Sequence, residues 1–201
     1  MKIVLANISK RFGSRLLFEN INIELHSGQC LAITGDNGTG KSTLLKIISG
    51  LTRPATGSIA IHYNNLSNIN NRPKFGLVSP DMAMYKALTA IENITFWSKL
   101  LGLSITESQA KELCGTVGLA GSEYKQLSTY STGMFQRLKL ATIMAVNPLV
   151  WLLDEPSSNL DESGKQIVKD VINRAVNSNS AVFLATNEAK EAEYANFKIK
   201  L

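Results

Sequence analysis

The sequence predicts an α/β fold with a mostly parallel central sheet, an N-terminal antiparallel β flap and an inserted helical subdomain. The runs 29–34, 149–154 and 181–186 are almost wholly apolar, as expected of strands buried on both faces of a parallel sheet. A glycine-rich loop follows the first of these runs and leads directly into an amphipathic helical run at 44–50. Helix signals replace strand signals between residues 80 and 147.

Strand signals occur on both sides of this helical stretch. The first two strands alternate apolar and polar residues or end in turn residues, which predicts the antiparallel flap. A turn cluster from Thr52 to Gly57 ends the first helix. The expected strands are 2–8, 20–25, 29–34, 58–63, 74–79, 149–154, 181–186 and 197–201.

Two capping-box patterns predict where helices begin in the middle of the chain. Thr89-x-x-Glu92 opens a helix that we expect to reach about Leu101, and Ser104-x-x-Glu107 opens a second one. The apolar face of that second helix consists of Ala110, Leu113, Cys114 and Val117. Two further helices are expected, at 133–146 and at 162–177.

Length and composition indicate one domain. A chain of 201 residues suits a full-sized α/β domain with a small insertion. We expect a single domain over 1–201, with a core of 1–79 and 148–201 and a helical subdomain of about 80–147. Met1 leads straight into a strand and no apolar run approaches about 18 residues, so neither a leader peptide nor a membrane span is expected.

The charges and cysteines are ordinary. The net charge is +5, and the basic N-terminal segment 1–18 is more simply a solvated face than a site for lipid or nucleic acid, so no nucleic-acid partner is expected. Cys30 and Cys114 lie in apolar surroundings, which predicts buried small hydrophobes rather than metal ligands.

The glycine-rich loop reads G-x-x-x-x-G-K-S, the spacing of a phosphate-binding loop in nucleoside triphosphatases. Its glycines let backbone N–H groups turn toward phosphate oxygens, and the following helix N-terminus adds partial positive charge. Lys41 supplies a full charge, and Ser42 places a hydroxyl where Mg²⁺ would lie between the outer phosphates. A chance glycine-rich turn is the alternative. The predicted nucleotide-binding residues are Gly35, Asp36, Asn37, Gly38, Thr39, Gly40, Lys41, Ser42 and Thr43.

Two carboxylates end the apolar run 149–154. The carboxyl end of a parallel strand faces the same crevice as the phosphate-binding loop. Asp154 is therefore predicted to hold the hydration shell of Mg²⁺ opposite Ser42, and Glu155 to polarise the attacking water. A solvated acidic turn before Pro156 is the alternative.

A third motif, Tyr130-Ser131-Thr132-Gly133-Met134, precedes the helix 133–146. Ser131 and Gly133 would offer a hydroxyl and backbone donors at a second helix N-terminus suited to phosphate. By this motif alone, a simple N-cap is the preferred interpretation. The order of motifs then ends with Ser158-Asn159-Leu160-Asp161.

In this order the chain resembles the ATP-binding cassette (ABC) ATPases, the nucleotide-binding subunits of ABC transporters, over nearly all 201 residues. Residues 35–43 are similar to the Walker A motif, and 150–155 to Walker B with its catalytic glutamate. Residues 130–134 resemble the signature motif in a variant common among exporters, and 158–161 resemble the D-loop. Phe12 falls where the family has an aromatic that stacks on adenine; a core residue of the flap is the alternative.

The resemblance implies a P-loop NTPase that binds ATP and Mg²⁺ and hydrolyses ATP. Two cassettes, identical or related, would pair head to tail, with the signature of one chain completing the site of the other. Both would drive a multi-span membrane subunit from the cytoplasmic face of the membrane. The implied residues are Lys41, Glu155 and Asn187 for catalysis, Ser42 and Asp154 for the metal, Ser131, Thr132, Gly133 and Met134 for the signature, and Ser158, Asn159, Leu160 and Asp161 for the D-loop.

Two positions depart from the family pattern. Pro80 stands where the family has a glutamine that touches Mg²⁺ and the attacking water, and proline offers neither a side-chain oxygen nor an N–H. Asn187 stands where the family has a histidine. The asparagine amide can donate a hydrogen bond to the γ-phosphate, but unlike an imidazole it cannot take up and carry a proton near neutral pH. We therefore expect slow hydrolysis rather than none.

Soft and aromatic residues follow Pro80. In the family this region receives a coupling helix of the membrane subunit, and methionines and aromatics suit such a groove. Ordinary packing of the helical block is an equally good interpretation. The residues concerned are Met82, Ala83, Met84, Tyr85, Phe96 and Trp97.

Three functions remain open from the sequence. The first is the ATPase subunit of an exporter, where the short chain resembles the compact haem-exporter ATPases of cytochrome c maturation. The second is a soluble cassette ATPase acting on DNA or ribosomes, although 44–130 contain no long coiled coil or metal module. The third is a slow ATP sensor, which the Pro80 and Asn187 departures favour.

Overall fold

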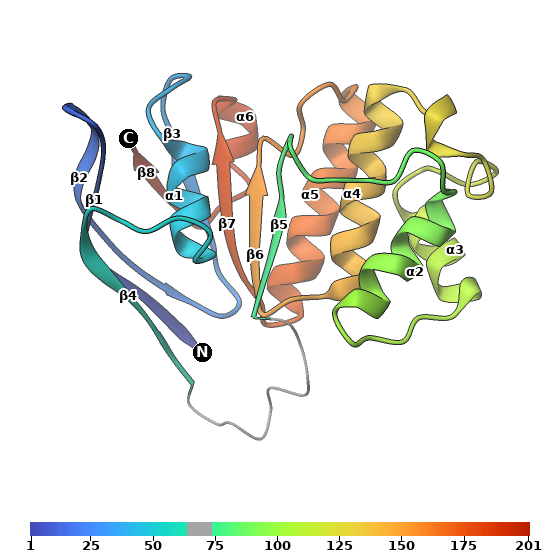
Figure 1. Cartoon of the computed structure of the whole chain (residues 1–201), viewed down its shortest axis with the longest axis horizontal. Helices are drawn as coiled ribbons and strands as arrows, with labels where there is room; N and C mark the ends of the chain where they lie inside the picture. Colours follow the sequence, from blue (N-terminus) through green and yellow to red (C-terminus); the bar gives the residue numbers. More distant parts are fainter. Residues whose placement is uncertain (64–73) are drawn as a thin grey trace.

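The computed structural model describes residues 1–63 and 74–201, and over these residues the chain forms two β-sheets and a block of helices (Figure 1). The central sheet has the strand order β5-β6-β7-β3-β8, and every pairing in it is parallel. Its strands are β3 (Cys30–Thr34), β5 (Phe75–Val78), β6 (Val150–Asp154), β7 (Ala181–Thr186) and β8 (Phe197–Lys200).

The second sheet is antiparallel, with the order β2-β1-β4. Its strands are β1 (Lys2–Phe12), β2 (Arg15–His26) and β4 (Thr56–His62). The predicted fold class is therefore confirmed: a mostly parallel core with an antiparallel N-terminal flap.

The apolar strands of the central sheet bury both of their faces. In β6, Val150 and Leu152 contribute to one hydrophobic core, whereas Trp151 and Leu153 contribute to the other. Alternate side chains of a strand point to opposite faces, so each face needs its own cover of apolar side chains. This double burial explains why the sequence shows continuous apolar runs here rather than alternation.

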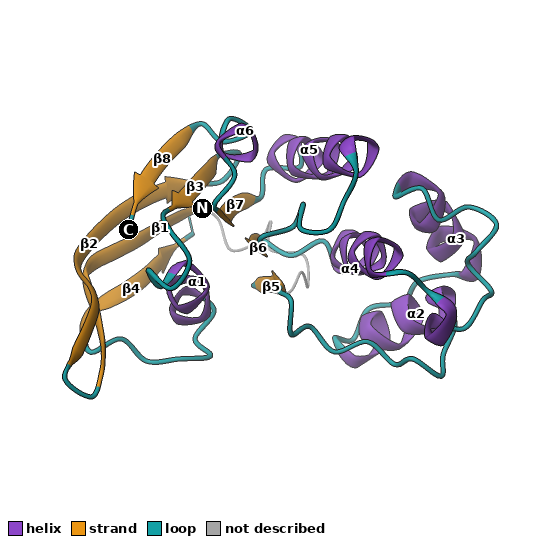
Figure 2. Cartoon of the chain, turned by 90° about the horizontal axis from the view of Figure 1, so that it is seen from above, coloured by secondary structure: helices purple, strands orange, loops and turns teal. Residues whose placement is uncertain are grey.

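Different elements cover the two faces (Figure 2). Helix α1 (Lys41–Ile48) lies between the flap and the central sheet, and its buried apolar residues share a core with β1 and β2. On the opposite face pack α5 (Glu162–Asn177) and the short α6 (Ala189–Ala192).

The helical block occupies one end of the molecule (Figure 1). It contains α2 (Ala90–Leu100), α3 (Glu107–Thr116) and α4 (Thr132–Val146), with a 3₁₀ turn at Leu127–Thr129 before α4. Both α2 and α3 pack on α4, which in turn contacts β5 and α5. Ten residues of the expected core segment 1–79, 64–73, lie outside the described residues. Among the described residues, no helix is long and apolar enough to cross a membrane.

Several element boundaries differ from the prediction. Strands β1 and β2 extend beyond 2–8 and 20–25 because Gly13 and Ser14 form a tight hairpin turn that pairs Phe12 with Arg15. Helix α1 begins at Lys41 rather than at 44, directly after the glycine loop. The short helix α6 and the 3₁₀ turn were not predicted.

The predicted start of α3 at Ser104 is wrong. Thr106 caps the helix: its hydroxyl accepts from the Gln109 N–H at 3.2 Å, and the Gln109 side chain accepts from the Thr106 N–H at 2.9 Å. Both Ser104 and Thr106 have an acid or amide three residues later, so spacing alone does not decide between them. The predicted capping box of Thr89 and Glu92 is confirmed.

Both cysteines are buried, as predicted. Burial raises the pKa of the Cys30 thiol to about 12 and that of Cys114 to about 11. Since the thiolate is the reactive species, these side chains serve packing rather than chemistry.

The α3 capping box gives the first testable prediction. Thr106→Ala removes the N-cap hydroxyl and is expected to lower the free energy of unfolding by about 1 kcal/mol. Ser104→Ala, at an exposed position just outside the helix, is expected to change it by less than about 0.5 kcal/mol. Urea denaturation of both variants measures the difference, and an equal loss from the two would show that Thr106 does not cap α3.

Candidate functional site

The glycine loop after β3 leads into α1 without a side-chain cap. Gly40 is the N-cap residue of α1, in a left-handed conformation with φ 108°, and no side chain bonds the first amides of the helix. A Cβ at Gly40 would lie 2.7 Å from the side chain of Leu17 on β2, so only glycine fits. The first N–H groups of α1 thus keep the positive end of the helix dipole available to an anion.

Lys41 reaches back over this loop. Its ammonium donates to the main-chain oxygens of Gly35, at 2.8 Å, and Asp36, at 3.1 Å, while the residue is only 5% exposed. A buried ammonium with two carbonyl partners is held in one place. It therefore forms a fixed positive charge at the mouth of the loop.

Ser42 and Asp154 meet, although 112 residues separate them. The Ser42 hydroxyl donates to Oδ1 of Asp154 at 2.9 Å. Burial raises the pKa of the Asp154 carboxyl, and the neighbouring Glu155 adds to this effect, whereas the bond from Ser42 and the charges of Lys46 and Lys41 oppose it. The expected pairing of these two residues is thus present as a direct hydrogen bond.

These donors fit a magnesium nucleotide. Mg²⁺ prefers oxygen ligands and is commonly held by one or two carboxylates or hydroxyls together with water and phosphate oxygens. The Ser42 hydroxyl and the Asp154 carboxylate supply two such oxygens beside a fixed ammonium and an uncapped helix N-terminus. The same group of residues therefore suits both the cation and the polyphosphate.

Glu155 is held in a strained conformation at the end of β6. Its φ of 48° is unusual for a residue other than glycine, and its N–H donates to the Ala185 carbonyl on β7 at 2.9 Å. Strain of this kind persists only where neighbouring structure enforces it, and it is frequent at functional sites. Glu155 thereby turns toward the phosphate-binding loop rather than continuing the strand.

One pocket brings together part of the predicted set, whereas Gly35, Asp36 and Asn187 line a different pocket. The first pocket has a volume of about 210 Å³ and joins Glu155 to the end of β1, where Phe12 is 57% exposed. The interpretation of Phe12 as a core residue of the flap is therefore wrong. The Lys10 ammonium lies 5.1 Å from the centre of the Phe12 ring. The lining residues are Phe12, Leu17, Asn37, Gly38, Gly40, Lys41, Ser42, Thr43 and Glu155.

Asn187 lies at the edge of this site. Its side-chain amide donates to Oδ1 of Asn37 in the phosphate-binding loop at 3.3 Å. Asn187 is exposed and directly follows β7. Two loops that are 150 residues apart in the chain are thus linked through Asn37, which lines the pocket.

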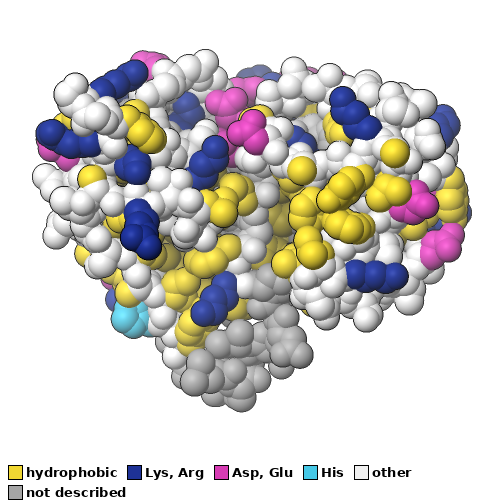
Figure 3. All heavy atoms as spheres, in the orientation of Figure 1, with side chains coloured by type: hydrophobic (Ala, Val, Ile, Leu, Met, Phe, Trp, Pro, Cys, Tyr) yellow, Lys and Arg dark blue, Asp and Glu magenta, His cyan; other side chains and the backbone are white. Residues whose placement is uncertain are grey.

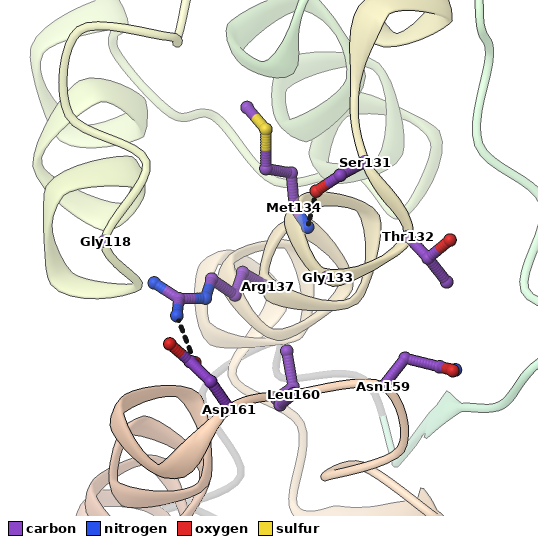
Figure 4. Close-up of a pocket in the computed structure, with 9 residues that line it drawn as sticks. All are labelled: Gly118, Ser131, Thr132, Gly133, Met134, Arg137, Asn159, Leu160 and Asp161. Carbon is purple, nitrogen blue, oxygen red and sulfur yellow. Dashed lines mark hydrogen bonds and ion pairs between the residues drawn. The ribbon is translucent and has the colours of Figure 1, made fainter.

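The signature-like residues line a separate groove of about 480 Å³ at the start of α4 (Figure 4). Ser131 is the N-cap of α4, and its hydroxyl accepts from the Met134 N–H at 3.3 Å. The interpretation of Ser131 as an N-cap is therefore correct. The groove residues are Gly118, Ser131, Thr132, Gly133, Met134, Arg137, Asn159, Leu160 and Asp161.

Arg137 joins the two walls of this groove (Figure 4). Its guanidinium donates to Oδ1 of Asp161 at 2.9 Å and to the Ser163 hydroxyl at 3.1 Å. Asp161 also caps α5 by accepting from the Gly164 N–H, and this bond is the largest cause of its lowered pKa. The D-loop-like segment is therefore fixed against the signature-like turn. Ser158 and Asn159 are joined by a side-chain hydrogen bond of 3.1 Å.

Sequence reasoning missed Glu191 on α6. This carboxylate is buried and accepts hydrogen bonds from both the N–H and the hydroxyl of Ser157, two residues after Glu155. Burial raises the pKa of Glu191, while bonds from Ser157 and Thr186 oppose the increase. The only sequence signal was an acidic residue in a short polar segment, which usually indicates a solvated face.

The ABC transporter family model matches residues 18–158. The chain is 31% identical to the lantibiotic transport ATP-binding protein SrtF of Streptococcus pyogenes, covering 94% of this chain and 81% of that protein. It is 32% identical to the cytochrome c biogenesis ATP-binding export protein CcmA of Rhizobium johnstonii, covering 90% and 86%. Import ATP-binding proteins for Fe(3+) ions and for sulfate or thiosulfate are also among the relatives.

A solved structure shares the fold. It is a dimeric ATP-binding cassette in a post-hydrolysis state, bound to ADP and Pi, and it matches with a TM-score of 0.81 at 24% identity. The match covers 99% of this chain and 94% of that one.

The buried Glu191 gives a prediction for pH. Because its pKa is raised in the folded chain, its contribution to stability is complete below the ordinary value of 4.5 and is lost as the pH rises through the folded-state pKa. Glu191→Gln removes this titration. The free energy of unfolding of the variant minus that of the parent should therefore increase from pH 4.5 to pH 7, because only the parent loses stability over this range.

Urea denaturation at both pH values measures this change, with Glu193→Gln, at an exposed position on the same segment, as the control. A Glu191→Gln variant with the same stability difference at both pH values would contradict the raised pKa.

Proposed function

Because the chain belongs to the ABC transporter family, we propose that it is the ATP-binding and ATP-hydrolysing subunit of an ABC exporter. It powers a separate multi-span membrane subunit by pairing with a second cassette when ATP binds. The observation that carries this proposal is the pocket in which Lys41, Ser42 and Glu155 meet.

In this proposal the triphosphate lies along the glycine loop. The N–H groups at the start of α1 and the Lys41 ammonium bind its oxygens, and the exposed Phe12 ring stacks on the base. Ser42 and Asp154 hold Mg²⁺, which supplies charge neutralisation for the outer phosphates. The remaining loop residues from Gly35 to Thr43 shape the cradle.

Glu155 is the proposed general base. Its carboxylate lines the same pocket as Lys41 and Ser42, so it can accept a proton from a water placed beside the terminal phosphate. Asn187, held by Asn37 at the pocket edge, is placed to donate to that phosphate. The bond from Glu155 N–H to the Ala185 carbonyl fixes the direction of the base.

The second cassette, identical or related, completes the site in this proposal. The groove at Ser131 and Gly133 shares no lining residue with the pocket at Lys41, so the two half-sites of one chain are separate. A helix N-terminus with small residues suits the terminal phosphate held by another chain. Thr132 and Met134 belong to the same turn, and the segment 158–161 forms the facing wall.

A membrane subunit is proposed to bind this chain and to respond when the two cassettes pair and separate. Hydrophobic side chains gather over the segment between β5 and α2 (Figure 3). Tyr85 is 47% exposed and its ring packs edge-on against Phe96 at 4.8 Å, while Met82 and Met84 pack partly into the core. This surface suits a helix of a membrane partner. The chain then lies in the cytoplasm, peripheral to the membrane, and co-purification with a multi-span protein tests this part.

Export is the proposed direction because SrtF and CcmA, named for transport and export, are matched over most of their own length. For the cargo, the proposed comparison is with the compact haem-exporter ATPases of cytochrome c maturation. A slow ATP sensor is the second candidate. It is favoured by Pro80, which is exposed and has no side-chain hydrogen-bonding group, and by Asn187.

The charge of Lys41 gives a prediction for ATP binding. Lys41→Ala removes the fixed charge of the loop and is expected to raise the Kd for ATP by at least about 100-fold, because one such charge pair is worth about 4 kcal/mol at an effective dielectric of about 20. Lys125→Ala, at an exposed position in the helical block, is the matched control. Calorimetric titration measures both; equal affinities would contradict the site.

The proposed general base, Glu155, is tested by a separate variant. Glu155→Gln is expected to bind ATP normally, to lose about 10²–10⁴-fold in hydrolysis and to form a stable dimer with Mg-ATP. Light scattering measures the dimer, and a chain that stays monomeric with saturating Mg-ATP would contradict the pairing.

The departures at Pro80 and Asn187 give a prediction for turnover. Pro80→Gln combined with Asn187→His supplies an amide and a proton-carrying ring, and we expect kcat to rise at least about tenfold over the parent. Pro80→Ala combined with Asn187→Ala removes the same side chains without supplying those groups and should not raise kcat. Steady-state phosphate release measures both, and a double variant no faster than the parent would show that these positions do not limit hydrolysis.

A further inference from the structure

Lys139, in the middle of α4, is a buried lysine with no role in the function proposed above. It is 7% exposed, and its ammonium donates to the main-chain oxygens of Ser79 at 2.8 Å and Pro80 at 2.9 Å. A buried ammonium is unfavourable unless its protons find acceptors, and these two carbonyls supply them. Both carbonyls lie directly after β5, at the edge of the sheet that carries the site.

Gln136 repeats this arrangement one turn earlier on α4. It is 8% exposed, and its amide donates to the Pro156 carbonyl at 2.9 Å. Residues three apart lie on the same face of a helix, so Gln136 and Lys139 point to the same side. Pro156 directly follows Glu155, and β6 is the neighbour of β5 in the sheet. Two adjacent loops are therefore bound to one helix face.

The loop after β5 also faces α1. Asp81 lies 3.7 Å from the Lys46 ammonium, although its side chain is 85% exposed, so this ion pair contributes little by itself. The loop nevertheless lies between the helix that begins at Lys41 and the helix that begins after Ser131. Pro80 offers no side-chain hydrogen bond, so the hydrogen bonds from the Lys139 ammonium to two main-chain oxygens attach this part of the loop to α4, beside the packing of Met82 and Met84.

We propose that Lys139, with Gln136, is a positioning residue: it fixes the Ser131 end of α4 relative to the loops that carry Pro80 and Glu155. This inference rests on the proposed function, because it assigns the contacts to ATP hydrolysis between paired cassettes. The clamp, meaning the bonds of Lys139 and Gln136 to these two loops, keeps the α4 N-terminus in register with the catalytic carboxylate. Neither residue touches the pocket at Lys41, so binding of ATP to one chain does not need the clamp.

The experiment replaces Lys139 by methionine, which keeps a long side chain and removes the donors. Kd for ATP should stay within about twofold of the parent, whereas kcat should fall about 10–100-fold, the scale expected when reacting groups are misplaced. Hydrogen exchange of the nucleotide-free chain should become faster for amides in 79–85 and unchanged in 35–43. Lys139→Arg, which keeps charge and donors, should restore part of the kcat, and Lys125→Met is the exposed control.

The outcomes decide between the clamp and the function it rests on. Unchanged exchange in 79–85, or an unchanged kcat, would overturn the clamp, and so would a loss of ATP affinity equal to the loss of kcat. If Lys139→Met does not fold, Lys139→Gln and Lys139→Arg are compared in the same assays, and equal exchange and kcat for the two would overturn it. A parent chain that fails to bind ATP would contradict the proposed function alone, since the exchange of 79–85 is measured without nucleotide.

Discussion

The parallel direction of the central sheet is the constraint on which the rest of the structure depends. Because all five strands run the same way, the loops that follow β3, β5, β6 and β7 leave from one edge of the sheet. Those loops carry the glycine turn, Pro80, Glu155 and Asn187. Side chains more than 100 residues apart in the chain, such as Ser42 and Asp154, therefore meet at hydrogen-bond distance. The site is therefore formed by the loops at this edge of the sheet, and the helices packed on the two faces hold the strands that carry those loops.

The helical block adds a second site, the groove at the N-terminus of α4. The N-terminus of α4 presents Ser131 in its own groove, while the middle of the same helix holds main-chain oxygens behind β5 and β6. One helix thus reaches both the groove and the catalytic edge. If such a rigid helix shifts as one body, a displacement at the groove also displaces the loops at the catalytic edge, without any change in the shape of the helix.

Much of this was readable from the sequence, and the failures have physical causes. Apolar runs located the central strands because those strands are buried on both faces, and the Gly40-Lys41-Ser42 motif located the phosphate-binding loop. The start of α3 was missed because Ser104 and Thr106 show the same spacing to a partner three residues later. The contacts of Glu191, Gln136 and Lys139 were also missed. Each is a polar side chain that finds a main-chain partner from a distant segment, and no local pattern encodes that meeting.

The two buried thiols have a practical consequence for studying the movements of this protein. With pKa values raised to about 12 and about 11, Cys30 and Cys114 stay protonated and shielded at neutral pH. A maleimide dye or a nitroxide would therefore react with a cysteine newly introduced at the surface and leave the native pair untouched. Optical or magnetic distance probes can be attached to the wild-type background, which keeps the packing of the two buried cysteines around β3 and α3.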